Sequence, residues 1–437
     1  MKNSIVKKNI IWFVYKELFK RYLTLRATYN NPQKWIKAQN REIKKFVKYI
    51  YNIPFYRARF DACGLTPNDI RRREDFKKLP PLTKQEYREW IQKETKDKTK
   101  YKDWMYRQTT GSSGTPLDLY SLPTDRVVEI ANLMRCAIIQ HKGHNPIFGR
   151  VFSTMTPKPP AKRKFSLCYD GKMSSIASPE DLVRGYNEAR PDFYYGNKTA
   201  VLMIAQYALD NNIKLHKPKC VGSISELLDD NARNICDKAY GEGIVFDIYG
   251  CAEVGNFAVD NPSTPGKHTI WNDTHVVNIF NGTSIKDNVE SGELMITSLV
   301  HRGFPLVNYL VGDTIELTIE DNVPYITKIL GRTNDEIKNI DGSTYKWMHI
   351  NRILFGYMEI IQFRVIQKSY TDLVFILAAP GLSKERRLEL QNEICQKSEN
   401  IFGSDLSSTG KKIHFDWVDQ IPPDPNGKVR ILISEVE

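Results

Sequence analysis

Amphipathic helices and apolar strands alternate along the middle of this chain, and that alternation limits the folds open to it. Residues 199–210 and 229–240 have helical spacing, and the second segment ends at Gly241, a residue common just after helices. The apolar run 244–248 follows as a buried strand. Because this pattern packs helices and strands into shared layers, we predict an α/β body.

The pattern changes near Gly331. Before it, residues 292–330 are rich in strand-like runs, and beyond it strands and a single helix suggest a small α+β unit. The predicted strands of that unit are 361–367, 373–379 and 412–417, and the predicted helix is 384–401. We therefore predict a large domain over residues 1–330 and a small, mobile C-terminal lid domain over residues 331–437.

Composition excludes several classes of protein. The chain has 437 residues, 41% of them hydrophobic, and no apolar run approaches the roughly 20 residues of a membrane-spanning helix. The start of the chain has no signal-peptide cleavage pattern, and the seven cysteines form no CxxC pair, so we predict a cytoplasmic protein. The net charge of +12 favours anionic partners, but no nucleic-acid module is present, and nucleic acid is not an expected partner.

Much of the positive charge lies at the start of the chain. Residues 1–26, within a basic and aromatic segment 1–36, carry seven Lys or Arg against Glu17 alone, with five aromatic residues between them. One interpretation is an amphipathic helix at the inner membrane face, which would make the protein peripheral there. The other, which we favour, is a helix packed on its own domain with a solvated basic edge.

A short loop of small hydroxyl residues and glycines has the chemistry of a phosphate cradle. Its backbone N–H groups and hydroxyls suit phosphate oxygens, and its glycines allow close approach. An ordinary flexible turn is the alternative for this string taken alone. Arg107 lies just upstream, and no Gly-Lys-Ser/Thr follows, so the loop is not a Walker A motif. The predicted contacts are Thr109, Thr110, Gly111, Ser112, Ser113, Gly114 and Thr115.

Four further motifs follow in order. They are Tyr249-Gly250-Cys251-Ala252-Glu253, Gly312-Asp313, Gly331-Arg332-Thr333-Asn334-Asp335-Glu336-Ile337-Lys338 and Gly427-Lys428. The set resembles the adenylate-forming (acyl-adenylate synthetase) superfamily. Ile53 to Arg57 and Leu79 to Lys84 resemble the phenylacetate–CoA ligase branch, which includes CapK-type proteins linked to capsular polysaccharide synthesis.

The resemblance implies an adenylate-forming fold and a role for each motif. Tyr249, with Gly250 and Cys251, would hold adenine, and Asp313 would accept hydrogen bonds from the ribose hydroxyls. Arg332 would reach ribose or phosphate oxygens. Taken singly, each of these residues could have a purely structural role, such as a half-buried tyrosine or a turn aspartate. The ordered set of motifs favours the functional roles.

The remaining roles concern chemistry and motion. Glu253 would bind Mg²⁺ beside ATP, because that cation prefers oxygen ligands. Lys428 would be catalytic, neutralising charge on the α-phosphate. Asp335 would be the hinge of the lid, with Lys338 in the same motif, although a solvated lysine is an equal alternative. Thr115 stands where relatives often carry a lysine.

The resemblance implies an AMP-forming acid ligase that uses ATP and Mg²⁺. It would activate a carboxylic acid and pass the acyl group to the thiol of coenzyme A or to an amine or hydroxyl acceptor, as in surface polysaccharide synthesis. Two alternatives stay open: a nucleotidyl transferase of the coenzyme F390 synthetase type, and a non-catalytic nucleotide-binding component of a polysaccharide system.

Overall fold

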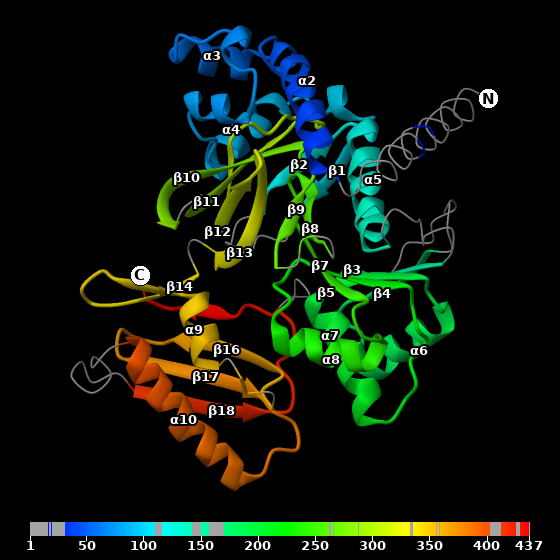
Figure 1. Cartoon of the computed structure of the whole chain (residues 1–437), viewed down its shortest axis with the longest axis vertical. Coiled ribbons are helices and arrows are strands. Elements are labelled where there is room, and N and C mark those ends of the chain that lie inside the picture. The colour runs from blue at the N-terminus through cyan, green and yellow to red at the C-terminus, as the bar shows by residue number, and fades with distance from the viewer. Residues whose placement is uncertain are drawn as a thin grey trace.

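A bent sheet of eleven strands forms the centre of the computed structural model (Figure 1). The structure describes residues 16, 19, 31–109, 116–141, 150–156, 170–261, 264, 266–286, 288–332, 335–354, 356–357, 359–402, 412–424 and 429–436. The strand order is β10-β11-β12-β13-β9-β8-β7-β6-β5-β3-β4. Their bounds are β3 Val151–Thr156, β4 Asp170–Ser174, β5 Phe193–Asn197, β6 Cys220–Ile224, β7 Val245–Cys251, β8 Gly255–Asp260, β9 His268–Ile270, β10 His275–Lys286, β11 Val289–Ser298, β12 Tyr309–Glu320 and β13 Val323–Arg332.

The two halves of this sheet differ in direction. One half is parallel and contains β4, β3, β5, β6 and β7. Antiparallel pairs of β7 with β8, β8 with β9 and β9 with β13 then lead to the other half, in which β10 to β13 form an antiparallel meander. Helices that follow parallel strands must return across the sheet, which explains the alternation seen in the sequence. The predicted α/β character is confirmed.

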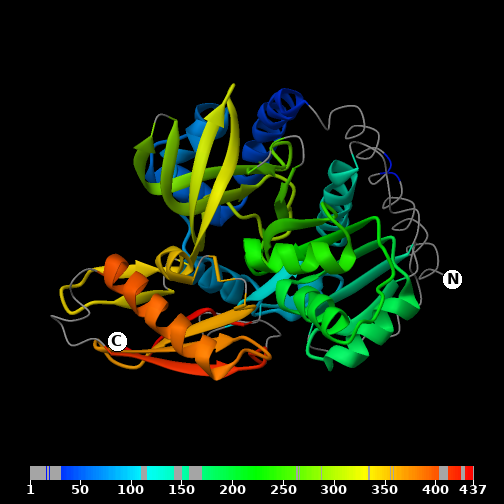
Figure 2. The same ribbon diagram turned by 60° about the horizontal axis from the view of Figure 1, so that its bottom comes forward.

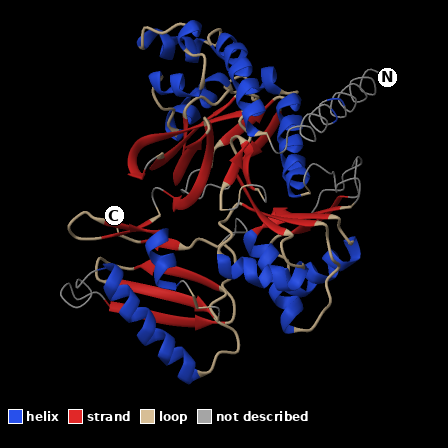
Figure 3. Ribbon diagram, viewed as in Figure 1, coloured by secondary structure: helices blue, strands red, loops and turns tan. Residues whose placement is uncertain are grey.

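Helices pack against both halves of the sheet (Figure 3). Those of the large part are α2 Pro32–Ile50, α3 Pro54–Ala62, α4 Lys84–Glu94, α5 Pro123–Gln140, α6 Pro179–Ala189, α7 Lys198–Asp210 and α8 Asp230–Tyr240, with short 3-10 turns at Pro67–Asp69, Arg73–Lys78 and Lys98–Tyr101 and a hairpin of β1 Met105–Gln108 with β2 Asp118–Ser121. One apolar cluster joins α2 to α4 with the antiparallel half, and a second joins α6 to α8 with the parallel half.

Local sequence explains where individual helices begin and end. Asp229 accepts a hydrogen bond from the Ala232 amide at the start of α8, and Gly241 follows its end with φ +128°. Thr83 and Glu86 form a capping box at the start of α4. The predicted helices 199–210 and 229–240 are therefore confirmed as α7 and α8.

The C-terminal unit, which we define as residues 335–436, has its own sheet and core. Its four-stranded sheet has the order β18-β17-β16-β19, and a short hairpin pairs β14 with β15. Its elements are β14 Glu336–Lys338, β15 Thr344–Lys346, α9 Trp347–Leu354, β16 Gln362–Gln367, β17 Asp372–Ala378, α10 Lys384–Phe402, β18 Lys412–Val418 and β19 Leu432–Ser434. Strand β13 of the large part continues through Gly331 to Arg332. The division of the chain into a large domain and a mobile lid domain stays a prediction.

The C-terminal unit lies below β12 and β13 and beside α7 and α8 (Figures 1 and 2). Hydrogen bonds join the two parts: the Asn231 side chain donates to the Tyr357 carbonyl at 3.1 Å, and Lys346 donates to the Thr314 hydroxyl at 3.3 Å. No helix of the described residues is long and apolar enough to cross a membrane.

Candidate active site

Three predicted nucleoside-binding residues, carried by β7, β12 and β13, come together through their side chains. The Tyr249 hydroxyl donates to Asp313 Oδ2 at 2.8 Å, and Arg332 Nε lies 3.1 Å from Asp313 Oδ1. Asp313 and Arg332 are paired across the β12–β13 ladder, so strand register sets their contact. The Asp313 carboxylate beside Arg332 raises the pKa of that guanidinium, which keeps it cationic.

The ring of Tyr249 is largely buried beneath this cluster. It packs against Phe257, with ring centroids 4.8 Å apart, and its exposed fraction is 9%. Burial, with the Asp313 carboxylate second, raises the pKa of Tyr249, so the phenol stays protonated and donates its hydrogen bond. The prediction that this ring stacks on adenine stays a prediction.

The loop between β7 and β8 carries the predicted metal ligand. Glu253 is partly buried, and its Oε1 accepts a hydrogen bond from the Tyr309 hydroxyl at 3.1 Å. Gly250 has to be glycine, because a Cβ there would lie 2.7 Å from the Gly255 carbonyl oxygen. Burial, followed by the Glu253 charge, raises the pKa of the Cys251 thiol, so this cysteine is not poised as a thiolate.

The start of the predicted phosphate loop is tied at its base. Thr109 N donates to the Leu117 carbonyl at 2.9 Å, and Leu117 N donates to Thr109 Oγ1 at 2.9 Å. These two bonds hold the ends of the loop together. The other predicted contacts, Thr110, Gly111, Ser112, Ser113, Gly114 and Thr115, lie outside the described residues.

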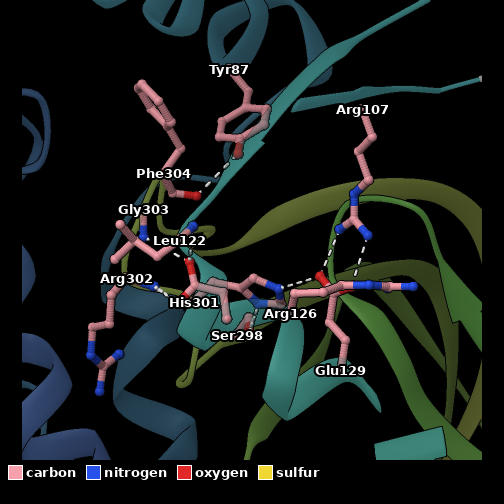
Figure 4. Close-up of polar contacts among 11 residues, drawn as sticks. Tyr87, Arg107, Leu122, Arg126, Glu129, Ser298, His301, Arg302, Gly303 and Phe304 are labelled. Carbon is pink, nitrogen blue, oxygen red and sulfur yellow. Dashed lines mark hydrogen bonds and ion pairs between the residues drawn. The ribbon is translucent and has the colours of Figure 1, made fainter. Parts of the chain in front are cut away.

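A buried charge network beside this loop was not predicted (Figure 4). Glu129 of α5 accepts two hydrogen bonds from Arg107, at 2.6 and 2.8 Å, and a third from Arg126. His301 Nε2 lies 2.9 Å from Glu129 Oε1, and His301 Nδ1 lies 2.6 Å from the Ser298 hydroxyl. Burial alone would raise the pKa of Glu129, but hydrogen bonds from His301 and Arg107 outweigh it and hold the pKa well below its usual range.

Glu129 contacts two segments that carry predicted site residues, β1 before the phosphate loop and the start of β8 after Glu253. Arg107 lies in β1, two residues before Thr109. A Cβ at Gly255 would lie 3.0 Å from Glu129 Cγ, which places the carboxylate stem against the β7–β8 loop. Of this network, the sequence points only to Arg107, through its place just upstream of the predicted loop. No local pattern singles out Glu129 or His301.

The predicted hinge residues lie at the junction with the C-terminal unit. Asp335 Oδ1 lies 3.6 Å from Arg430 Nη2, and burial raises the pKa of Asp335, opposed by Arg430 and Arg332. Lys338 donates from Nζ to the Val436 carbonyl at 3.1 Å. The Lys338 amide donates to Gln367 Oε1 at 2.9 Å, and Gln367 Nε2 donates to the Lys338 carbonyl at 2.7 Å. Lys338 is thus engaged in the structure of the C-terminal unit; its hinge role and that of Asp335 stay predictions.

The predicted catalytic residue Lys428 lies outside the described residues, but its neighbour Val429 is described. Val429 N donates to Glu226 Oε1 in the large part at 3.1 Å. Within the described ranges no three His, Cys, Asp or Glu side chains gather as a metal site. Glu253 alone fits Mg²⁺ held mainly by nucleotide phosphates, since that cation commonly uses one or two carboxylates with substrate phosphates.

Comparison with known proteins finds sequence relatives and structures of similar fold. No family model matches the sequence. The chain is 25% identical over 420 residues to the protein CapK of Staphylococcus aureus, covering 91% of this chain and 89% of CapK. It is 24% identical over 317 residues to the phenylacetate-coenzyme A ligase of Escherichia coli (strain K12), covering 68% and 71% of the two chains.

The fold is also found among solved structures. The chain resembles 2-hydroxyisobutyryl-CoA ligase in the postadenylation state with a TM-score of 0.74 at 16% identity, covering 94% of this chain and 92% of that one. The TM-score with the same enzyme in its thioesterification state is 0.57. The chain therefore has the fold of this acyl-CoA ligase. Its sequence relatives include CapK and the phenylacetate-coenzyme A ligases.

Proposed function

We propose that the protein is an ATP-dependent carboxylate-activating ligase. A carboxylate oxygen attacks the α-phosphorus of ATP, the bond to the β-phosphate breaks, and pyrophosphate leaves the acyl-adenylate behind. A nucleophile then attacks the acyl carbon, its proton passes to solvent, and AMP leaves. Both steps depend on positioning and charge stabilisation, which a set of fixed donors and a lysine can supply.

One observation carries the proposal: the Tyr249–Asp313–Arg332 cluster joins three separate motifs in hydrogen-bonding distance. In the proposed complex the remaining lone pairs of the two Asp313 carboxylate oxygens accept hydrogen bonds from the ribose hydroxyls. Arg332 contributes positive charge beside them. Glu253 would hold Mg²⁺, which neutralises phosphate charge when bound. The two hydrogen bonds between Thr109 and Leu117 would hold the base of the loop while its N–H and hydroxyl groups donate to the β- and γ-phosphates.

The proposed substrate is a small carboxylic acid, and the proposed acceptor is the thiol of coenzyme A or an amine or hydroxyl of a sugar precursor. The phenylacetate-coenzyme A ligase relatives support the thiol. The proposed place in surface polysaccharide synthesis rests on the sequence resemblance to CapK-type proteins. We propose that the enzyme acts in the cytoplasm. Apart from residues 16 and 19, the segment 1–26 lies outside the described residues, and its contact with the inner membrane face stays the alternative to packing on its own domain.

Pyrophosphate exchange into ATP tests the proposal with a panel of carboxylic acids. We expect exchange that depends on an added acid, and a loss of about 10²-fold or more in Lys428→Ala, as follows removal of one transition-state donor. ATP binding should change little in that variant. No exchange with any acid would support a non-catalytic nucleotide-binding role, and a stable AMP ester of a hydroxyl compound would support nucleotidyl transfer.

A further inference from the structure

A carboxylate of the large part reaches the C-terminal segment that follows Lys428. Glu226 comes two residues after the end of β6, and its Oε1 accepts the amide hydrogen of Val429 at 3.1 Å. These residues are 203 positions apart in the chain. We infer that Glu226 is a positioning residue that holds this segment against the large part for adenylation, an inference that rests on the proposed function.

The Glu226 side chain is itself held in place. Thr199 donates to it twice, from its hydroxyl at 2.7 Å and from its amide at 3.1 Å. That amide is in the first turn of α7, whose N-cap residue makes no side-chain capping bond. Because the first amides of a helix lack partners within it and attract negative charge, the helix start fixes the carboxylate.

The turn that carries Glu226 is strained. Ser225 has φ +77°, a left-handed conformation that is unfavourable for a residue with a side chain. Such strain persists where the surrounding structure requires it, and often where a side chain has to be aimed. Here it turns the chain between β6 and Glu226, so that the carboxylate faces both α7 and the C-terminal unit.

The Val429 side of the contact is equally well held. Its side chain is buried with Ala378 and Ile421 in a small apolar cluster of the C-terminal unit. The next residue, Arg430, donates its amide to Asp424 at 3.2 Å, and Arg364 donates to the Arg430 carbonyl at 2.9 Å. The Val429 amide is therefore a rigid donor that moves with the C-terminal unit.

The consequence follows from chain connectivity. A peptide bond joins Val429 to Lys428, and consecutive Cα atoms are only about 3.8 Å apart, so an anchor on one residue restricts its neighbour. If the C-terminal unit turns to a second pose for acyl transfer, this bond must break. Glu226 should therefore favour the adenylation step and be dispensable for transfer from a preformed adenylate.

The first experiment reads the contact directly and does not depend on activity. Hydrogen exchange of the Val429 amide, measured by mass spectrometry with site-resolving fragmentation, is compared in the full-length wild type and Glu226→Ala. We expect at least tenfold faster exchange in Glu226→Ala and partial protection in Glu226→Gln, whose amide oxygen still accepts. Equal exchange in the wild type and Glu226→Ala would overturn the inference.

The second experiment separates the two half-reactions. We expect Glu226→Ala to lower kcat for pyrophosphate exchange about tenfold with little change in KM for ATP, because it removes a hydrogen bond to a charged group. Acyl transfer from preformed adenylate should stay within twofold. The control is Asn231→Ala, which removes another bond between the two parts, to Tyr357, far in sequence from Lys428; we expect it to slow exchange less than twofold.

These outcomes distinguish two failures. If the wild type shows no acid-dependent exchange, the proposed function fails, while the hydrogen-exchange comparison still decides whether Glu226 holds Val429. If the wild type is active but Glu226→Ala loses both half-reactions equally, or loses no more exchange than Asn231→Ala, the positioning role of Glu226 is wrong.

Discussion

Replacing Glu129 with glutamine removes the charge at the centre of the buried network but keeps the size of the side chain. The Glu129 side chain is 3% exposed, and its partner His301 is 6% exposed, so solvent cannot replace the lost interactions there. Breaking a buried ion pair from one side costs about 3–5 kcal/mol. Since Arg107 and Arg126 are 30% and 40% exposed and can turn to water, we expect the lower end, about 3 kcal/mol.

That loss should be visible as a lower melting temperature. An unfolding entropy of about 2.1 cal/mol/K per residue gives about 0.6 kcal/mol/K for a unit of roughly 300 residues, so Glu129→Gln should lower Tm by about 5 °C. Differential scanning calorimetry measures it. The matched control is Glu320→Gln, whose carboxylate is 49% exposed and pairs with Lys267, a class of ion pair worth about 0–1 kcal/mol. Equal shifts in the two variants would refute the reasoning.

The same comparison has a defined pH dependence. The pKa of Glu129 is lower in the folded protein than in the unfolded chain, so its contribution to stability is fully present above the unfolded value of about 4.3. It is lost as the pH falls below that value toward the folded pKa. The Tm gap between wild type and Glu129→Gln should therefore be constant from about pH 7 to pH 5.5 and narrow below about pH 4. A gap that widens on acidification would contradict this assignment.

Three further substitutions test the site and its motion. Gly250→Ala should destabilise the protein or displace the loop before Glu253, because the new Cβ meets backbone atoms at 2.7 and 2.8 Å; an unchanged Tm together with unchanged exchange would show that the backbone yields freely. Asp313→Ala should raise KM for ATP with little change in kcat, since ribose bonding exists before the transition state, and steady-state exchange kinetics measure it. Asp335→Pro should leave one half-reaction near normal and depress the other, because proline fixes φ at a hinge; assays of each half-reaction decide, and equal loss in both would leave no hinge there.

Local pattern in the sequence was enough for much of the fold. The helices over 199–210 and 229–240 and the strand after Gly241 are set by spacing of apolar residues and by caps, which act within a few positions. Tyr249 and Asp313 became site candidates because the ordered motifs of the sequence resemble the adenylate-forming superfamily. The structure brings the two side chains into hydrogen-bond contact.

Only the tertiary structure decided which distant residues share a charge or a hydrogen bond. His301 reaches Glu129 across 172 positions, and Val429 reaches Glu226 across 203. No local sequence pattern predicts either contact, because a glutamate within a helix or after a strand is usually exposed to solvent. Such a glutamate takes part in a fixed contact only where the fold buries it beside hydrogen-bond partners. Sequence periodicity determines which face of an element is apolar, whereas the order and bend of the sheet determine which polar residues meet.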